Sequence, residues 1–319
     1  MAAKATALDI LSFGEAMVEF NAAGPARDGA TYVQGYGGDT SNVVIAAVRQ
    51  GARAGYLTAL GADLFGDALL ELWRREGVDT THVIRRDDAA TGIYFVTHDR
   101  DGHQFTYYRA GSAASRVTPA DVSAAAIAGA RILHLSGISQ AISESAAATA
   151  AEAIAQARAH GVKVSYDPNL RLKLWPLARA RAVIDATVAL ADIVLPSLED
   201  ARTLTGREGA DEILDHYLGL GAPLVALKLG REGCLIGTAQ ARRRLPGHRV
   251  QTVDATGAGD AFVGAFLARL AMGDNPLAAA AYANAAAALS TTGYGAVAPI
   301  PSRAAVERLL AEAGSRVAS

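Results

Sequence analysis

The sequence predicts an α/β protein in which a mainly parallel sheet carries a small antiparallel lid sheet. From residue 40 onward, apolar strand-like runs alternate with helical stretches, which is typical of a parallel sheet with helices on its faces. Two β-rich segments, Thr91 to His98 and His103 to Arg109, interrupt this alternation. The turn between them, Asp99-Arg100-Asp101-Gly102, contains the Asp-Gly pair that favours hairpins. The hairpin therefore predicts a second, smaller sheet.

The elements are expected in the following order. Segments 12–20 and 30–34 are β-like and complete the lid together with the hairpin. For the main sheet and its covering helices, we expect strands at 54–60, 131–136, 162–166, 193–195 and 224–229, and helices at 43–50, 67–76, 145–160, 260–272 and 277–289. No linker is long enough to divide the chain. We expect one domain over residues 1–319, with its lid formed by segments of about 12–36 and 90–112.

Composition narrows the class of protein. The formal net charge is -2, so no nucleic-acid partner is expected, and the one basic run, Arg242 to Arg244, is interpreted as a solvated face. The single cysteine, Cys234, allows no internal disulfide and suits a reducing cytoplasm. The start of the chain lacks the layout of a signal peptide. The apolar stretch from Leu277 to Leu289 is too short for a membrane span and predicts a buried helix.

The strongest chemical signal is Asp254-Ala255-Thr256-Gly257-Ala258-Gly259-Asp260, between a strand-like segment at 248–253 and a helix. Glycines let successive N–H groups turn toward one point, and a helix N-terminus adds partial positive charge. We therefore expect Gly257, Ala258 and Gly259 to form an anion hole for a phosphate group. Asp260 is placed to accept a proton from a substrate hydroxyl, and a simple helix cap is the alternative.

Two better-known phosphate motifs are absent. Phe262 occupies the third glycine position of the dinucleotide-binding fingerprint, which excludes a nicotinamide oxidoreductase of that type. The Gly-x4-Gly-Lys-Ser/Thr loop is missing as well. Instead, Asp254 to Gly264 resembles the C-terminal signature of the PfkB, or ribokinase-like, carbohydrate kinases. A second family signature appears as Gly37-Gly38-Asp39-Thr40-Ser41-Asn42, followed by Gly51, Gly61, Asp63 and Gly66.

This resemblance implies a three-layer α/β/α sandwich, phosphoryl transfer from ATP, and Asp260 as the catalytic base. The family's Asn-x-x-Glu motif, which orients the hydration shell of Mg²⁺, appears here as Ser197-Leu198-Glu199-Asp200. Glu199 and Asp200 are therefore candidates to hold Mg²⁺ through water, since this ion keeps most of its waters. The resemblance further implies ATP-binding residues at Ser197, Lys228, Gly230, Gly233 and Asn284. Plain helix packing remains open for Asn284, as does a need for a monovalent cation.

Two arginines point to an acidic substrate. Tyr107 and Arg109 share one face of a strand while Tyr108 takes the other, and Arg171 follows a strand end, where ligands gather in open α/β sheets. Arginine is the preferred bidentate partner of a carboxylate. The alternative is that both arginines make surface salt bridges. A carboxylate-bearing sugar suits the pair better than a neutral one.

The segments around these arginines resemble the 2-keto-3-deoxygluconate kinases within the family. The resemblance implies phosphorylation of the primary hydroxyl to give the 6-phosphate, at a substrate site lined by Gly38, Asn42, Tyr94, Tyr107, Arg109 and Arg171. An acidic residue that some relatives place after the adenine-side helix is missing here, since Tyr294 follows Gly293. A kinase of fructose or ribose and a non-catalytic sensor on the same fold remain alternatives, and the C4 epimer is open. Lid strands of this family often pair between subunits, which is consistent with a dimer.

Overall fold

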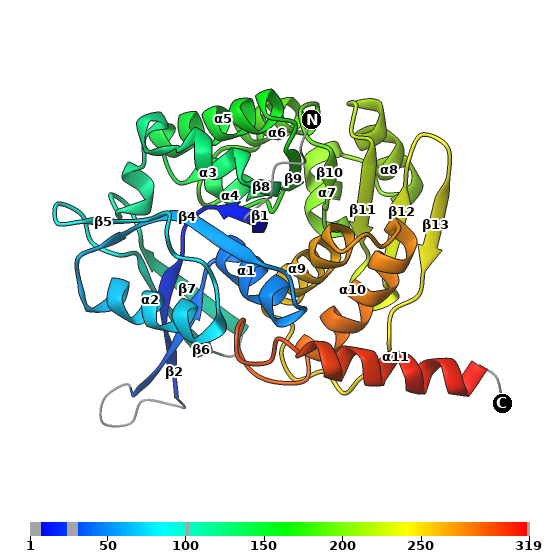
Figure 1. The fold of residues 1–319 in the computed structure, drawn as a ribbon. Coiled ribbons are helices and arrows are strands. Elements are labelled where there is room, and N and C mark those ends of the chain that lie inside the picture. Colours follow the sequence, from blue (N-terminus) through cyan, green and yellow to red (C-terminus); the bar gives the residue numbers. More distant parts are fainter. Residues whose placement is uncertain (1–7, 24–30, 100–101, 318–319) are drawn as a thin grey trace.

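The computed structural model describes residues 8–23, 31–99 and 102–317. The hairpin turn expected at 99–102 lies partly outside these ranges, as does the start of the chain before Leu8 and part of the lid segment expected at 12–36. Within them the chain forms two sheets, a large one through the middle of the molecule and a small one at its edge (Figure 1).

The large sheet has nine strands in the order β13-β12-β11-β10-β9-β8-β1-β4-β5. From β5 to β11 every neighbouring pair is parallel, and β12 and β13 are antiparallel. All eight residues of β4 are buried, as expected for a parallel strand covered on both faces. The strands are β1 (Leu8–Phe13), β4 (Ala54–Gly61), β5 (Val83–Arg86), β8 (Ala130–Ser136), β9 (Lys163–Asp167), β10 (Ile193–Val194), β11 (Leu224–Lys228), β12 (Cys234–Gly237) and β13 (Arg242–Leu245).

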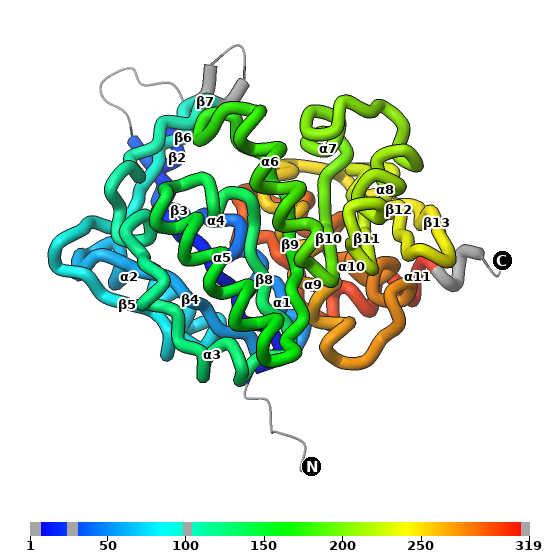
Figure 2. The backbone as a smooth tube through the Cα atoms, turned by 90° about the horizontal axis from the view of Figure 1, so that it is seen from above, coloured from blue at the N-terminus to red at the C-terminus, as the bar shows by residue number. Residues whose placement is uncertain are grey.

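Helices cover both faces of this sheet, and each face has its own hydrophobic core. One core is formed with α1 (Asp39–Arg49), α2 (Leu64–Glu76), α9 (Ala258–Ala271), α10 (Pro276–Ser290) and α11 (Arg303–Val317). The other is formed with α3 (Ala124–Ala128), α4 (Gly137–Ala141), α5 (Glu144–Ala159), α6 (Leu177–Val188), α7 (Leu198–Thr205) and α8 (Ala210–Gly219). Figure 1 shows the two helical layers on opposite sides of the sheet, and Figure 2 looks down on the layer that contains α5 and α6. The three-layer α/β/α sandwich is therefore confirmed.

The small sheet has the strand order β3-β2-β6-β7, with β2 (Met17–Ala22), β3 (Tyr32–Gly37), β6 (Ile93–Asp99) and β7 (Gly102–Tyr108). Its register sets Glu19 opposite Tyr94, and Tyr94 opposite Tyr107. Residues directly opposite one another share a face of a sheet. Three polar side chains from three strands therefore line one face of the lid.

Three local expectations were wrong. Segment 12–20 is two strands in two sheets, since β1 ends at Phe13 and β2 begins at Met17. Between them the chain passes close to α1, and a Cβ on Gly14 would lie 2.2 Å from Thr40 Oγ1. Segment 248–253 forms no strand, since the N–H of Val253 bonds the carbonyl of Thr291 in the loop after α10. The helices α1, α2 and α9 begin two to four residues earlier than expected.

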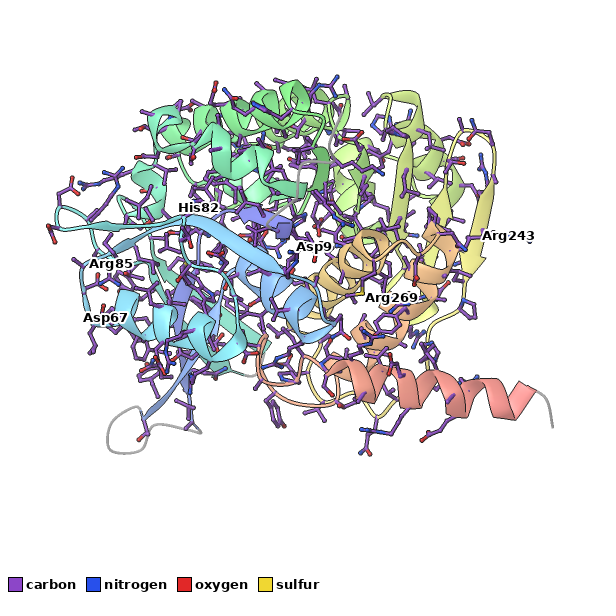
Figure 3. All side chains as sticks on the ribbon, viewed as in Figure 1. Asp9, Asp67, His82, Arg85, Arg243 and Arg269 are labelled. Atoms are coloured by element: carbon purple, nitrogen blue, oxygen red, sulfur yellow. The ribbon has the colours of Figure 1, made fainter. Side chains whose placement is uncertain are left out.

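The structure also describes the residues that composition singled out. Cys234 is buried. The arginines of β13 are exposed, and Figure 3 shows Arg243 at the outer edge of the molecule. Arg242 pairs with Asp211 and Asp215. Of the helices in the described ranges, none is both long enough and apolar enough to cross a bilayer.

Candidate active site

The first turn of α9 contains the residues of the predicted anion hole. Gly257 allows the chain to turn sharply into this helix. Gly257 has φ 75°, in the left-handed region that favours glycine, and a Cβ there would lie 2.8 Å from the carbonyl oxygen of Ala296. Ala258 and Gly259 are the first two helical residues, so the expected anion hole is a helix N-terminus rather than a loop. Gly259 is exposed, which leaves this positive end of the helix open to an anion.

Asp260 does not cap the helix. It is the third residue of α9, and its Oδ2 accepts a hydrogen bond of 2.8 Å from Asn42 Nδ2. Burial raises the pKa of Asp260 to about 7, and the charge of Asp39 adds to the rise, while the Asn42 bond and the Lys228 charge oppose it. A carboxylate with a pKa near neutrality suits a general base. The structure thus favours the catalytic interpretation of Asp260 over the capping one.

Asn42 is placed by the start of α1. Gly38 precedes that helix with φ 121°, and a Cβ on it would lie 2.5 Å from the carbonyl oxygen of Glu15, so only glycine fits. Asn42 then lies one turn inside α1, which packs against α9. Its Oδ1 is buried and accepts no hydrogen bond from the described residues. This free acceptor beside Asp260 is available to a substrate hydroxyl.

The carboxyl ends of two parallel strands meet next to this pair. Asp167 ends β9 and accepts hydrogen bonds from Lys228 Nζ at 2.5 Å and from the backbone N–H of Asn169 at 3.2 Å. Asn169 has φ 31°, an uncommon conformation for a residue with a side chain, and its Nδ2 donates to Asp39 Oδ2 at 2.8 Å. These bonds tie the loop that carries Arg171 to both β11 and α1.

Arg109 has a partner that the sequence did not reveal. Glu15 follows β1, its side chain is fully buried, and Arg109 Nε donates to its Oε2 at 2.7 Å. Ser112 Oγ donates to Oε1 of the same carboxylate at 2.5 Å. Arg109 Nη2 also lies 2.5 Å from Glu15 Oε2, without hydrogen-bond alignment, and it is buried with no hydrogen-bond partner in the described ranges. Arg109 is therefore neutralised by Glu15, and its buried Nη2 has no aligned acceptor among the described residues.

Tyr94 occupies the middle of the lid face, where a glycine makes room for it. Its hydroxyl donates to Glu19 Oε2 at 2.5 Å, and a Cβ on Gly37 would lie 2.3 Å from that hydroxyl. Burial and then the Glu19 charge raise the pKa of Tyr94, and the charge of Asp260 raises it further. The lid face is therefore close enough to Asp260 for the charge of that carboxylate to act on Tyr94. Sequence reasoning missed Glu19, although the alternation Met17, Glu19, Asn21 in a strand could have indicated it.

Tyr107 lies within electrostatic reach of both arginines. Burial raises its pKa, while the charges of Arg109 and Arg171 oppose that rise. The ring centroid of Tyr107 lies 5.5 Å from the ring centroid of Tyr94. The guanidinium of Arg109 lies 5.7 Å from the same Tyr107 centroid. Tyr108 is 63% exposed and contacts Phe95 on the other face, as the alternation predicts. Arg171 is exposed, and its Nη1 donates a hydrogen bond to the carbonyl of Leu170.

Four of the residues expected to bind the nucleotide already have structural roles. Ser197 caps α7 by accepting from the N–H of Asp200, and it pairs with Lys228 in an isolated parallel bridge. Asn284 donates to the carbonyls of Leu245 and Pro246, so its amide already serves packing. Gly230 and Gly233 form the tight turn between β11 and β12, both with positive φ.

The two acidic candidates for magnesium differ in placement. Glu199 is exposed, whereas Asp200 is half-buried and its charge acts on Asp167 and Tyr217. Asp200 therefore lies close enough to Asp167, the partner of Lys228, for their charges to interact. Among residues 8–23, 31–99 and 102–317, no group of three or more His, Cys, Asp or Glu side chains is arranged to hold a metal ion.

Known carbohydrate kinases are similar to this chain over most of its length. A 2-dehydro-3-deoxygluconokinase of Bacillus subtilis (strain 168) is 35% identical over 302 residues, which cover 93% of each chain. Fructokinase-1 of Oryza sativa subsp. japonica is 35% identical over 319 residues, covering 95% of this chain and 98% of its own. A structure of fructokinase from Vibrio cholerae O395, in a form with bound fructose, ADP and calcium ion, superposes with TM-score 0.85 at 30% identity, covering 95% and 99% of the two chains.

The family profile described as pfkB family carbohydrate kinase matches residues 7–303, which span the site from β1 to the start of α11. That match covers well over half of the chain, and it includes both signatures and the pair of Asn42 and Asp260. The protein belongs to the pfkB family of carbohydrate kinases.

Proposed function

We propose that the protein transfers a phosphoryl group from ATP to the primary hydroxyl of a sugar acid, with 2-keto-3-deoxygluconate as substrate and its 6-phosphate as product. The observation that carries this proposal is the polarity of the site. Arg109 and Arg171 act on Tyr107 at the lid, and Asp260 lies at the start of α9. An extended sugar acid has its carboxylate and its primary hydroxyl at opposite ends, which is the separation of charge that the proposal requires of this site.

Asp260 takes the proton of the primary hydroxyl, whose oxygen then attacks the γ-phosphorus in line. Asn42 orients the Asp260 carboxylate through its 2.8 Å bond, and its free Oδ1 accepts from the sugar. The N–H groups of the first turn of α9 stabilise the charge that develops on the phosphoryl oxygens. Asp200 would hold the Mg²⁺ that accompanies ATP through water, and that ion would neutralise phosphate charge.

The small sheet acts as a lid of a single kinase domain over residues 1–319. Tyr94 and Tyr107 present polar hydroxyls to the sugar from the lid face, while the lid excludes water from the phosphoryl group. Exclusion of water favours transfer to the sugar over hydrolysis of ATP.

A neutral-sugar kinase is the second candidate, because two carboxylates weaken the positive potential of the lid. Glu15 neutralises Arg109, and Glu19 lies on the same lid face as Tyr94. The rice and Vibrio relatives named above are fructokinases. Arg171 decides between the two candidates, since it is the cation at Tyr107 that has no carboxylate partner among the described residues.

A coupled assay of ADP release across matched substrates tests the proposal. The panel contains 2-keto-3-deoxygluconate, its C4 epimer 2-keto-3-deoxygalactonate, fructose and ribose, each with ATP and Mg²⁺. We expect turnover with the sugar acids and at most weak turnover with the neutral sugars. Preferred turnover of fructose or ribose would replace the sugar acid with the second candidate. No turnover with any substrate would favour a non-catalytic sensor.

A further inference from the structure

Arg49 joins two helices to an irregular stretch of chain, the support segment (residues 295–300). It is the last residue of α1, and its side chain is 22% exposed. Its Nε and Nη2 each donate at 2.8 Å to a carboxylate oxygen of Glu76, the last residue of α2. Its Nη1 donates to three carbonyls, those of Val297 at 3.1 Å, Ala298 at 3.4 Å and Ile300 at 2.5 Å. One guanidinium fork therefore holds a carboxylate and three backbone carbonyls together.

The support segment packs against the turn that leads into α9. A Cβ built on Gly257 would lie 2.8 Å from the carbonyl oxygen of Ala296, the residue before the first carbonyl that Arg49 contacts. The N–H of Gly295 donates at 2.9 Å to Oδ2 of Asp254, three residues before Gly257. The backbone at the start of α9 is therefore fixed by its contacts with this segment.

The support segment depends on such side chains for its position. It contains no helix or strand, so its backbone groups need partners from elsewhere in the fold. The residue after Arg49 adds a second attachment, since Gln50 Nε2 donates to the carbonyl of Pro301 at 2.8 Å. Tyr282 of α10 donates to Gln50 Oε1 at 2.8 Å and holds that amide in place. The end of α1 therefore ties this irregular stretch to the helical layer.

A half-buried arginine and glutamate can also form a purely structural pair. Glu76 uses only Nε and Nη2 of Arg49, however, and Nη1 is left for the support segment. The carbonyls that it contacts follow directly on Ala296, which touches the position of Gly257. This arrangement gives Arg49 a direct mechanical connection to the first turn of α9.

We propose that Arg49 is a positioning residue for phosphoryl transfer. It holds the support segment against Gly257, and the N–H groups of the first turn of α9 then keep their orientation toward the phosphoryl group. The proposal rests on the proposed function, in which these N–H groups stabilise the developing charge. Donors of this kind act because they are oriented before the reaction begins. A displacement of about 1 Å caused far from the reacting atoms can cost a factor of about 10² in rate.

Steady-state kinetics of a charge-neutral double variant test the proposal. Arg49→Met/Glu76→Gln removes both charges of the pair, so that no buried carboxylate is left without its cation. Its kcat should fall by about tenfold to a hundredfold, because the donors of α9 are no longer held in place. KM for the sugar should change by less than about threefold, since the lid and Arg171 are unaltered.

The chain offers a matched control at the other end of α9. Arg269 lies in the last turn of that helix, and its Nε donates to Asp274 Oδ2 at 2.7 Å. The side chains of this pair are 21% and 24% exposed, against 22% and 19% for Arg49 and Glu76. Figure 3 labels Arg269. Arg269→Met/Asp274→Asn should lower the melting temperature to a similar extent and leave kcat unchanged, because it breaks no contact with the support segment.

Hydrogen exchange followed by mass spectrometry tests the same connection without turnover. In Arg49→Met/Glu76→Gln, peptides covering residues 253–260 and 291–301 should exchange on the order of tenfold faster, since the charged donor that holds the segment is lost. The same peptides of the Arg269→Met/Asp274→Asn variant should exchange as in the unaltered protein. Arg49→Lys replaces the double variant if that variant does not fold, and it should show the same changes at smaller size because lysine lacks the planar fork.

Faster exchange at 253–260 together with a lower kcat and an unchanged sugar KM supports the proposal. Unchanged exchange there overturns it, as does a kcat that falls no further than in the Arg269→Met/Asp274→Asn variant. A rise in sugar KM as large as the fall in kcat also overturns it, because the damage would then extend to the sugar side. If the unaltered protein phosphorylates no sugar, the proposed function is wrong, and the exchange at 253–260 alone supports or overturns the hold of Arg49 on this turn.

Discussion

Replacing Asp260 by asparagine should remove activity and at the same time stabilise the fold. The side chain keeps its size and can still accept from Asn42, whose bond to Oδ2 is 2.8 Å. Removal of a general base costs about 10²–10⁴ in kcat. In the unaltered protein, kcat/KM should rise with pH through about 7, because burial raises the pKa of the base to about 7 and only its ionised form accepts the proton.

The stability effect has a definite sign. The pKa of Asp260 rises from 3.8 to about 7, chiefly through burial. At about 1.36 kcal/mol per pKa unit, ionised Asp260 costs the folded state up to about 4 kcal/mol. This cost is absent below pH 3.8, grows as pH rises, and is complete above about pH 7. Asp260→Asn removes it, so the variant should exceed the unaltered protein in unfolding free energy at pH 8, and the difference should shrink toward pH 4.

Urea unfolding at pH 8, 6 and 4 measures this difference directly. Asp9→Asn is the control of opposite sign, since burial raises the pKa of Asp9 but hydrogen bonds from Arg53 lower it overall. The Asp9→Asn variant should be less stable than the unaltered protein at pH 8. Figure 3 labels Asp9, which is well separated from Asp67 and Arg85. An Asp260→Asn variant that keeps turnover, or that is less stable than the unaltered protein at pH 8, would contradict the assignment of Asp260 as a general base with a raised pKa.

The other predictions concern the arginines and the glycines of α9. Arg171→Ala should raise KM for 2-keto-3-deoxygluconate about tenfold or more, since a hydrogen bond to a charged group contributes roughly 1.5–3 kcal/mol, with no such change on fructose; equal losses on both would remove the carboxylate from this position. Arg109→Ala should raise KM too, but it should also lower the melting temperature because it leaves Glu15 buried without its cation; an unchanged melting temperature would show that Glu15 is solvated. Gly257→Val should destabilise the fold, whereas Gly259→Ala should weaken ATP binding in a folded protein; unchanged ATP affinity in folded Gly259→Ala would place the phosphates elsewhere.

The sequence indicated the main sheet and the phosphate end of the site because both depend on local pattern. Strands such as β4 are mostly apolar and buried throughout, and their length and flanking glycines distinguish them from helices. The glycines around Asp260 determine the local backbone conformation, so they are visible in the sequence as a short motif. The exact start of α9 was not predictable from a motif, because it depends on the positive φ of Gly257 and on close packing against Ala296.

The lid side of the site was harder to predict because its charges are paired across long sequence separations. Glu15 and Arg109 are 94 residues apart, and Glu19 and Tyr94 are 75 residues apart. Each pair forms only when the small sheet and the end of β1 come together. Sequence reasoning found the two arginines but treated them as equal, and the pairing with Glu15 makes them different.

A competition assay tests the central claim most directly. The unaltered protein is given equal concentrations of 2-keto-3-deoxygluconate and fructose in one vessel with limiting ATP, and mass spectrometry quantifies the two phosphorylated products. The product ratio equals the ratio of kcat/KM values, which is the measure of specificity. The account predicts an excess of the sugar-acid 6-phosphate that Arg171→Ala reduces about tenfold or more. An excess of fructose phosphate from the unaltered protein would contradict it.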